Sequence, residues 1–383
     1  MTPPATSVSA DKLQSRELNA TTKSFLQGVE QNSEGPLSAL SRWLFQNQIC
    51  TLLSAVNFYP FQRRHRNSRF FVRLWNQEHH YPLISHSTND HVMSSLNDLL
   101  KIANPVRAGV LAAFNVTAHP DEVLQIPSRD EGRFIRIHAY NTVNRDAPAP
   151  VLANFHGSGF VNPLHGSDDE FCRFIAKKTG LAVLDCSYRL GPENQFPSSI
   201  HDAEDAVRWI LAHPEKFDIS RLSISGFSAG GLLSWVVSSV LFPQGTFKNV
   251  IAVYPPTDMV QASTDKIAPD TSNDVTPVEL LDAFVKCYYP NRVDLKNVLA
   301  SPSLIPVEKF SDRILLVTGA CDRLCLEGEA LGNNIKDATT KYVKMHRYDR
   351  CEHAFDKGYK KGSVQERAKD DLYEKAAFFL RSD

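Results

Sequence analysis

The stretch RLSISGFSAGGLLSW (221–235) joins two short apolar runs through a turn with glycines placed symmetrically around Ser228. Gly226, Ser228 and Gly230 form the pattern G-x-S-x-G, whose characteristic setting is a strand that turns at once into a helix. Such a turn strains the serine backbone, and side chains in place of either glycine would collide with neighbouring backbone. An ordinary glycine-rich bend is the alternative. The pattern in its setting predicts that Ser228 stands at the tip of a strand with its hydroxyl accessible.

From about residue 130 onward, short apolar runs alternate with amphipathic segments of helical period. Continuous apolar runs are typical of parallel strands buried on both faces, and right-handed crossovers place helices on both faces of such a sheet. We therefore predict an α/β fold with a mostly parallel, twisted central sheet. The expected strands cover residues 133–140, 150–156, 181–188, 221–226, 249–255, 313–320 and 341–348. The expected helices cover 168–180, 198–217, 228–242, 326–338 and 365–381.

Two further strand ends supply the partners that a serine nucleophile needs. A serine hydroxyl is weakly nucleophilic at neutral pH and requires a histidine base that a carboxylate orients. Asp322 follows the run 313–320, and His353 follows the last expected strand, which gives the order Ser, Asp, His that this type of fold uses. Asp258 also follows a strand and is the rival acid. The positions at strand ends favour Asp322 and His353 as the partners of Ser228.

A glycine-rich turn, HGSGF (156–160), ends another expected strand. Small residues there would let the backbone approach a substrate and direct N–H groups at an oxygen that develops negative charge. The amide of Ala229, at the start of the helix after Ser228, would face the same point. An ordinary strand-to-helix turn is the alternative, and the presence of Ser228 makes an oxyanion-binding turn the better interpretation.

In this order, the motifs resemble the hormone-sensitive-lipase-like branch of the α/β-hydrolase superfamily, the alpha/beta hydrolase fold-3 esterases. HGSGF resembles that family's His-Gly-Gly-Gly loop, and GFSAGG resembles its nucleophile elbow. DCSYRLGPENQFPSSIHDAEDAVRW resembles its Asp-Tyr-Arg-Leu-Ala-Pro-Glu stretch, LASPSL with LLVTGACDRLCLEGEAL its acid-bearing segment, and CEHAF its histidine loop. The resemblance covers about residues 130 to 380 and implies an α/β-hydrolase fold with a helical cap.

The resemblance also implies a role for each matching residue. Ser228 would be the nucleophile, Asp322 the orienting acid and His353 the base. The oxyanion would be held by main-chain amides, with the candidates Gly157, Ser158, Gly159 and Ala229. Apart from the resemblance, we expect Arg189 and Glu193 to support the elbow region without taking part in the chemistry.

Two residues depart from the family pattern. Ser158 stands where the family usually has glycine, and because the donor is a main-chain amide, the small side chain need not abolish it. Phe227 stands where the elbow usually has Asp or Thr, which removes a polar contact. We expect Phe160 and Phe227 to line the substrate pocket, and we expect selectivity to differ from that of the family at Ser158 and Phe227.

The N-terminal part of the chain matches the family by no motif. Residues 1–20 are polar and rich in Ser, Thr and Pro, so a disordered tail is expected there. Residues 21–120 have helical spacing and would contribute to the cap. Residues 121–383 would form the catalytic domain, with a cap insertion at about 258–300 that carries a helix within 275–290. An apolar N-terminal helix suits a cap or a homodimer surface equally well.

Composition excludes several classes of protein. The formal net charge is −1, so no overall field attracts nucleic acid or anionic lipid. Seven scattered cysteines form no disulfide framework, the N-terminus lacks a signal peptide, and no apolar run is long enough to span a membrane. A cytoplasmic protein is expected. Cys321, Cys325 and Cys351 with His353 match zinc spacing poorly, so neither a metal nor another cofactor is expected.

The expected reaction is hydrolysis of small-molecule esters, with short- to medium-chain or acetyl groups, through an acyl-enzyme. An amidase or deacetylase on the same triad is the nearest alternative. Two other classes stay open on the same fold: a lyase that eliminates water, and a ligand receptor without catalysis. The receptors that resemble this family lack the triad histidine, whereas His353 is present here.

Overall fold

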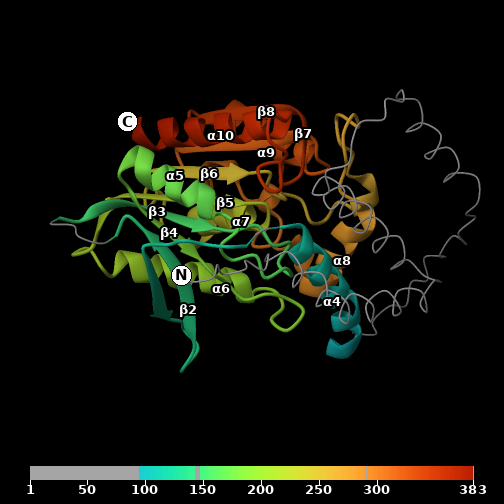
Figure 1. The fold of residues 1–383 in the computed structure, drawn as a ribbon, viewed down its shortest axis with the longest axis horizontal. Coiled ribbons are helices and arrows are strands. Elements are labelled where there is room, and N and C mark those ends of the chain that lie inside the picture. The colour runs from blue at the N-terminus through green and yellow to red at the C-terminus, as the bar shows by residue number, and fades with distance from the viewer. Residues whose placement is uncertain (1–94, 115, 143–146, 290, 383) are drawn as a thin grey trace, which may run out of the picture.

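The computed structural model describes residues 95–114, 116–142, 147–289 and 291–382 (Figure 1). The expected tail over 1–20 and most of the helical segment over 21–120 lie outside these residues. The strands are β1 (Glu122–Pro127), β2 (Phe134–Tyr140), β3 (Ala149–Phe155), β4 (Ala182–Cys186), β5 (Phe217–Phe227), β6 (Asn249–Val253), β7 (Arg313–Cys321) and β8 (Tyr342–Glu352). The α-helices are α4 (Leu96–Ala113), α5 (Asp169–Thr179), α6 (Ser198–Leu211), α7 (Ala229–Val236), α8 (Val278–Tyr288), α9 (Cys325–Ala338) and α10 (Val364–Arg381).

The eight strands form one sheet in the order β1-β2-β4-β3-β5-β6-β7-β8. All pairs from β4 to β8 are parallel, whereas β1 pairs antiparallel with β2, and β2 pairs antiparallel with β4. The predicted mostly parallel sheet is therefore confirmed. Strand β1 was not predicted, because only Ile126 of its six residues is buried and the alternation is too weak to mark a strand.

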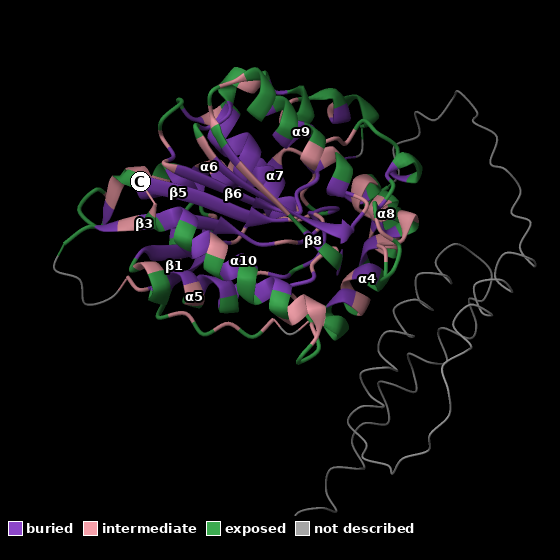
Figure 2. Cartoon of the chain, turned by 90° about the horizontal axis from the view of Figure 1, so that it is seen from above, coloured by how far each residue is buried: buried purple, intermediate pink, exposed green. Residues whose placement is uncertain are grey.

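Helices cover both faces of the sheet, as Figure 2 shows from above. Helices α5 and α10 pack on one face around a core that includes Phe171 and Leu372. Helices α6, α7 and α9 pack on the other face around a larger core that includes Trp235 and Ile335. The apolar residues of α10 recur at helical spacing, and its N-cap Ser363 accepts a hydrogen bond from the amide of Glu366. The predicted α/β architecture is confirmed.

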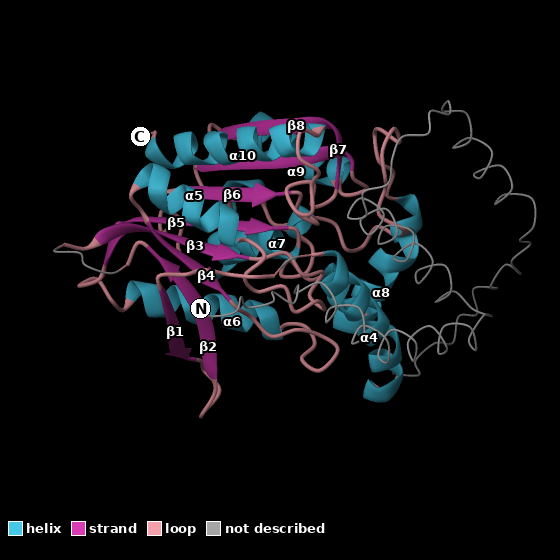
Figure 3. Cartoon of the chain, in the orientation of Figure 1, coloured by secondary structure: helices cyan, strands magenta, loops and turns pink. Residues whose placement is uncertain are grey.

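The arrowheads of the parallel strands point toward α4 and α8 (Figure 3). These two helices pack on each other through Val106, Val110 and Leu280. Arg107 of α4 also donates to both carboxylate oxygens of Glu193, in the loop after β4, and to the main-chain oxygen of Gly191. Helix α8 lies inside the expected insertion. Among the described residues, no helix combines the length and the apolar character that crossing a bilayer would require.

Candidate active site

Ser228 lies at the sharp turn between β5 and α7, with a positive φ of 51°. A Cβ atom at Gly226 would lie 2.0 Å from the main-chain oxygen of Gly230, and one at Gly230 would lie 1.8 Å from the oxygen of Phe155. No side chain fits at such distances. Both glycines are therefore required by close backbone approach, as the sequence predicts, and the turn holds the Ser228 hydroxyl clear of the sheet.

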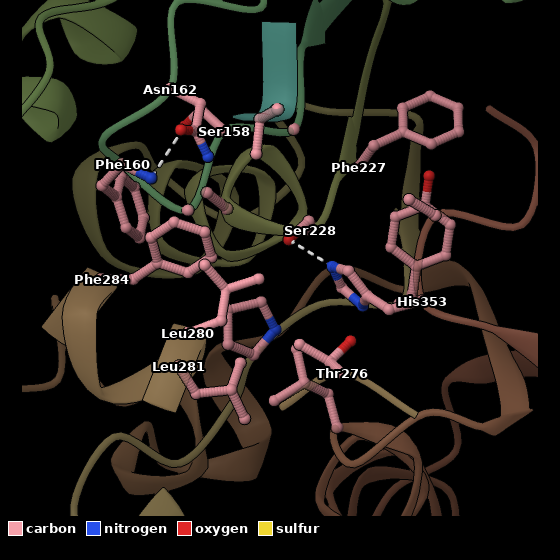
Figure 4. A pocket seen from close by; sticks show the side chains of 18 of the residues that line it. Ser158, Phe160, Asn162, Phe227, Ser228, Thr276, Leu280, Leu281, Phe284 and His353 are labelled. Carbon is pink, nitrogen blue, oxygen red and sulfur yellow. Dashed lines mark hydrogen bonds between the residues drawn. The ribbon is translucent and has the colours of Figure 1, made fainter. Parts of the chain in front are cut away.

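The structure brings Ser228, His353 and Asp322 together at the ends of three strands. Figure 4 shows the hydrogen bond between Ser228 and His353. His353 Nε2 lies 2.8 Å from Ser228 Oγ, and His353 Nδ1 lies 2.7 Å from Asp322 Oδ2. Asp322 is buried, and its second oxygen accepts the amide hydrogen of Leu324 at 3.0 Å. Each contact has the geometry of a nucleophile, a base and an orienting acid.

Asp258, the rival acid, makes different contacts. Its Oδ1 accepts hydrogen bonds from the amides of Val260 and Gln261, at 2.8 Å and 3.1 Å, within its own turn. The carboxylate therefore stabilises a turn, and the position beside the imidazole belongs to Asp322.

The electrostatic environment of His353 suits a base that becomes charged during the reaction. Burial lowers its pKa, but the Asp322 carboxylate outweighs burial, first by its charge and then by its hydrogen bond, and raises the pKa above the ordinary value of 6.5. The Tyr254 ring and the imidazole pack edge to face, with centroids 4.8 Å apart. Asp322 therefore stabilises the imidazolium of His353, and it holds the ring in the orientation that faces Ser228.

The HGSGF turn lies directly beside the elbow. A Cβ at Gly157 would lie 3.5 Å from Ser228 Cβ, and Gly159 has a φ of +57° with the ring of Phe284 packed on it. Among the described residues, no acceptor faces the main-chain N–H groups of Ser158 and Gly159. The amide of Ala229 at the first turn of α7 has no partner within the helix either. These amides are available to a negatively charged oxygen.

The hydroxyl of Ser158 is bound within the loop. Its Oγ accepts the amide hydrogen of Phe160 at 2.8 Å and lies 2.8 Å from the hydroxyl of Tyr188. Tyr188 in turn donates to the main-chain oxygen of His156 at 2.5 Å. The serine that replaces the usual glycine therefore fastens the loop to itself and to the segment after β4.

A cavity of about 270 Å³ opens in front of Ser228 and His353. Its wall opposite the elbow is almost entirely apolar and comes from α4, α8 and the segments beside them, with the side chains of Val110, Phe114, Leu164, Leu280, Leu281 and Phe284. Polar side chains such as Gln261, Lys266 and Thr276 also line the cavity away from the elbow, so most but not all of the surface that a substrate would meet is apolar.

Phe160 and Phe227, the two expected pocket residues, both border the cavity. The ring of Phe160 stacks on Tyr288, with centroids 4.4 Å apart. The ring of Phe227 points away from the Ser228 hydroxyl (Figure 4) and is completely buried, in edge-to-face contact with Phe171. Its aromatic surface therefore belongs to the core beneath the elbow.

Lys357 explains how an aromatic ring can occupy position 227. Its ammonium lies 4.4 Å from the centroid of the Phe227 ring. It also lies 2.9 Å from Asp168 Oδ1 and 2.8 Å from Asp356 Oδ2, contacts that are ionic and not well-aligned hydrogen bonds. Burial lowers the pKa of Lys357, but Asp168 and then Asp356 outweigh burial and raise it. A charged lysine under the ring replaces the polar contact that Phe227 lacks.

Lys357 was not identified from the sequence. It comes shortly after His353, in the loop before the last helix, and no motif marks it. The tripeptide FDK (355–357) gives little information, because a lysine beside an aspartate in a loop is ordinarily solvated.

Three other expectations can be placed. Arg189 donates a hydrogen bond to the buried carboxylate of Asp202, and the carboxylate of Glu193 accepts hydrogen bonds from Arg107. These contacts are those of structural supports. Cys321, Cys325 and Cys351 are buried free thiols, and among the described residues they do not form a metal cluster with His353.

A protein-family match covers the part of the chain that holds the site. The family model described as alpha/beta hydrolase fold matches residues 152–357, which hold every residue of the candidate triad. The chain belongs to this family, and its predicted place in the hormone-sensitive-lipase-like branch is confirmed.

Among curated relatives, the chain is similar to the esterase LipI of Mycobacterium tuberculosis, with 31% identity over 46% of this chain and 56% of that protein. It is also similar to the ethyl acetate hydrolase of Pseudomonas putida, with 28% identity over 56% of this chain and 69% of that protein. The matched part thus spans little more than half of the first relative.

Among solved structures, the chain is similar to EstE1, a thermostable carboxylesterase from a metagenomic library. The TM-score is 0.62, with 25% identity over 76% of this chain and 99% of that one. An esterase from Pyrobaculum calidifontis gives a TM-score of 0.60 with 24% identity over 74% and 88% of the two chains, which indicates a shared fold.

Proposed function

We propose that this protein is a serine carboxylesterase that hydrolyses small-molecule esters. The observation that carries the proposal is the continuous chain of contacts from Ser228 Oγ through His353 to Asp322, with distances of 2.8 Å and 2.7 Å. The named activities of LipI and the ethyl acetate hydrolase support it. No step of this chemistry requires a metal or an organic cofactor.

In the proposed mechanism, His353 takes the proton of Ser228 as its oxygen attacks the ester carbonyl carbon. The amides of Ser158, Gly159 and Ala229 donate to the tetrahedral oxyanion, while Asp322 stabilises the imidazolium. His353 then gives the proton to the leaving alcohol. In the second half, His353 takes a proton from a water whose oxygen attacks the acyl-enzyme carbonyl carbon, and it gives that proton to Ser228 Oγ as the carboxylic acid leaves.

The cavity supports short- to medium-chain or acetyl esters as substrates. Its volume of about 270 Å³ is at the lower end of the roughly 300–1,000 Å³ of drug-sized ligand sites. Its lining is mainly apolar, so a charged acyl or alkyl group would lose most of its hydration on entry. An uncharged, compact ester fits both properties.

The test combines turnover with covalent labelling. Purified protein is expected to hydrolyse p-nitrophenyl acetate and butyrate faster than laurate, and a fluorophosphonate should label Ser228, as located by mass spectrometry. Ser228→Ala should lower kcat by roughly four to six orders of magnitude and abolish labelling, while Ser220→Ala on the surface changes neither.

Other outcomes would reassign the function. Neither turnover nor labelling of the wild type would favour a receptor, which the presence of His353 in the triad geometry argues against. Elimination of water from a substrate that survives Ser228→Ala would indicate a lyase. Faster turnover of an amide than of the ester with the same acid would indicate an amidase or deacetylase.

We also propose a cytoplasmic location and leave a homodimer as part of the proposal. The free buried thiols of the described residues fit a reducing compartment. Fractionation of cells that express the tagged protein tests the location, and light scattering after size exclusion tests the dimer.

A further inference from the structure

Three polar side chains converge at the antiparallel edge of the parallel sheet, apart from the triad. His138 lies on β2, Asp185 lies on β4, and His165 lies in the loop between β3 and α5. One nitrogen of each imidazole and one carboxylate oxygen all lie within 4.8 Å of one another. Imidazole and carboxylate are ligands of divalent transition metals.

Two side-chain atoms of this cluster have no hydrogen-bond partner. Asp185 is completely buried; its Oδ1 accepts a hydrogen bond from Asn154 at 2.9 Å, but its Oδ2 has none. His138 is 5% exposed, and its Nδ1 has no partner. Because an unpaired buried polar atom costs about 1–3 kcal/mol in general, two such atoms in one cluster favour an occupant that binds to them.

The loop is shaped to bring the third group to this point. Gly166 has a φ of +102°, and a Cβ there would lie 3.4 Å from Cε1 of His138. The preceding His165 stacks on His138, with centroids 4.0 Å apart, and its Nε2 lies 3.6 Å from Asp185 Oδ2. Nε2 donates at 2.9 Å to the main-chain oxygen of Asp185, and this hydrogen bond holds the imidazole beside Asp185 when no ligand is bound.

The buried network around Asp185 holds more carboxyl groups than cations, while Arg136 contributes a positive charge near His138 and His165. The amide of Asn154 donates hydrogen bonds to Asp185 and Asp168. Lys357 forms ion pairs with Asp168 and with Asp356. This buried network holds three carboxyl groups and one ammonium. A second positive charge at Asp185 would let the carboxylate ionise without an uncompensated buried charge.

We propose that His138, His165 and Asp185 bind a divalent metal ion of the zinc type. In a tetrahedral site with bonds of about 2.0 Å, ligand atoms lie roughly 3.3 Å apart, close to the 3.6 Å between His165 and Asp185. Binding replaces the hydrogen bond from His165 to the main-chain oxygen and parts the two stacked rings. Solvent completes the coordination. The ion fastens the loop that begins with the HGSGF turn to β2 and β4.

A buried water is the competing occupant, because it could also bridge the two orphan atoms. The two occupants differ in one measurable respect. A metal site adds one equivalent of tight metal binding that depends on Asp185, whereas a water site adds none.

The experiment titrates the metal-free full chain with Co²⁺, follows ligand-field absorption, and then displaces Co²⁺ with Zn²⁺. The informative variants are Asp185→Asn, which retains an acceptor for Asn154, and His165→Gln, which retains a donor. Each is expected to weaken one equivalent of binding by roughly a hundredfold. His119→Ala, which removes an exposed imidazole, should bind as the wild type does.

Thermal melting provides a second readout. Zn²⁺ should raise the melting temperature of the wild type but not of Asp185→Asn, which should fold without metal because it lacks the buried charge. If wild type and both variants bind the same number of equivalents with equal affinity, the site holds water and the proposal is wrong. Fluorophosphonate labelling is measured separately, so a failure of the metal site is distinguishable from a failure of the proposed esterase function.

Discussion

The two sides of the cavity are built differently. The elbow side consists of residues at strand ends, where backbone atoms nearly touch and each polar group of Ser228, His353 and Asp322 has a short contact. The cap side consists of apolar side chains from α4 and α8, which lie far apart in the sequence. Changes on the elbow side should therefore alter the chemical step or the fold, whereas changes on the cap side should alter substrate preference.

After Ser228→Ala, the largest effect on activity is expected from Asp322→Asn. The amide retains the shape of the carboxylate but neither stabilises the imidazolium nor holds the reactive tautomer, so kcat should fall by roughly four orders of magnitude. Steady-state kinetics with p-nitrophenyl butyrate measures this fall. Asp258→Asn is the matched control and should retain at least about half of the activity. Equal losses in the two variants would contradict the assignment of the acid.

Gly230→Ala should abolish or severely destabilise folding. The new Cβ would lie 1.8 Å from the main-chain oxygen of Phe155, so β3 and α7 would have to separate. We expect a loss of about 3 kcal/mol or more in the free energy of unfolding, measured by urea denaturation. Gly157→Ala, with its nearest contact at 3.4 Å, is the control and should remain folded. A Gly230→Ala protein as stable as the wild type would contradict the close approach of α7 to the main-chain oxygen of Phe155.

The pH dependence tests the electrostatics of the elbow side. Activity requires neutral His353, whose pKa is raised by Asp322, so kcat/KM should fall about tenfold per pH unit below a midpoint that lies above 6.5. The residual activity of Asp322→Asn should show this midpoint at lower pH, because the charge that stabilises the imidazolium is gone. A midpoint that does not move would separate Asp322 from the base.

Phe227→Leu should have a moderate effect, chiefly on stability. It removes the ring that lies under the Lys357 ammonium and packs on Phe171, at a cost of about 1–2 kcal/mol in the free energy of unfolding. Phe227→Asp, the residue more usual in the family, should cost more, because a third carboxylate would join the two that already share Lys357. Urea denaturation of both variants gives the order, and the reverse order would contradict the role of Lys357.

The smallest effect is expected on the cap side, from Phe284→Ala. The ring covers Gly159 and borders the cavity, so its removal should widen the site without touching the triad. We expect kcat/KM for p-nitrophenyl laurate to rise by a few fold relative to acetate. Leu304→Ala, at an exposed position outside the cavity, should leave this ratio unchanged. An equal fall in kcat/KM for all chain lengths would show that Phe284 supports the chemical step and does not set substrate preference.

Much of the elbow side could be predicted from the sequence, because each of its residues follows an apolar strand in a fixed order. Ser228, Asp322 and His353 come together in the structure as that order indicates. Strand β1 could not be predicted, because one buried residue gives no alternation. Lys357 and Asp185 were missed for a different reason: their significance comes from contacts between distant segments, such as the 4.4 Å approach to the Phe227 ring, which no local pattern records.

The hydroxyl of Ser158 affects how much conformational entropy is lost when a substrate binds. A loop of glycines is free in the absence of ligand, and a substrate must supply the free energy that orders it. Here Tyr188 and the amide of Phe160 restrain the loop in advance. An acetyl ester has few atoms and therefore little binding energy. It would bind to a loop whose conformational entropy has already been lost during folding.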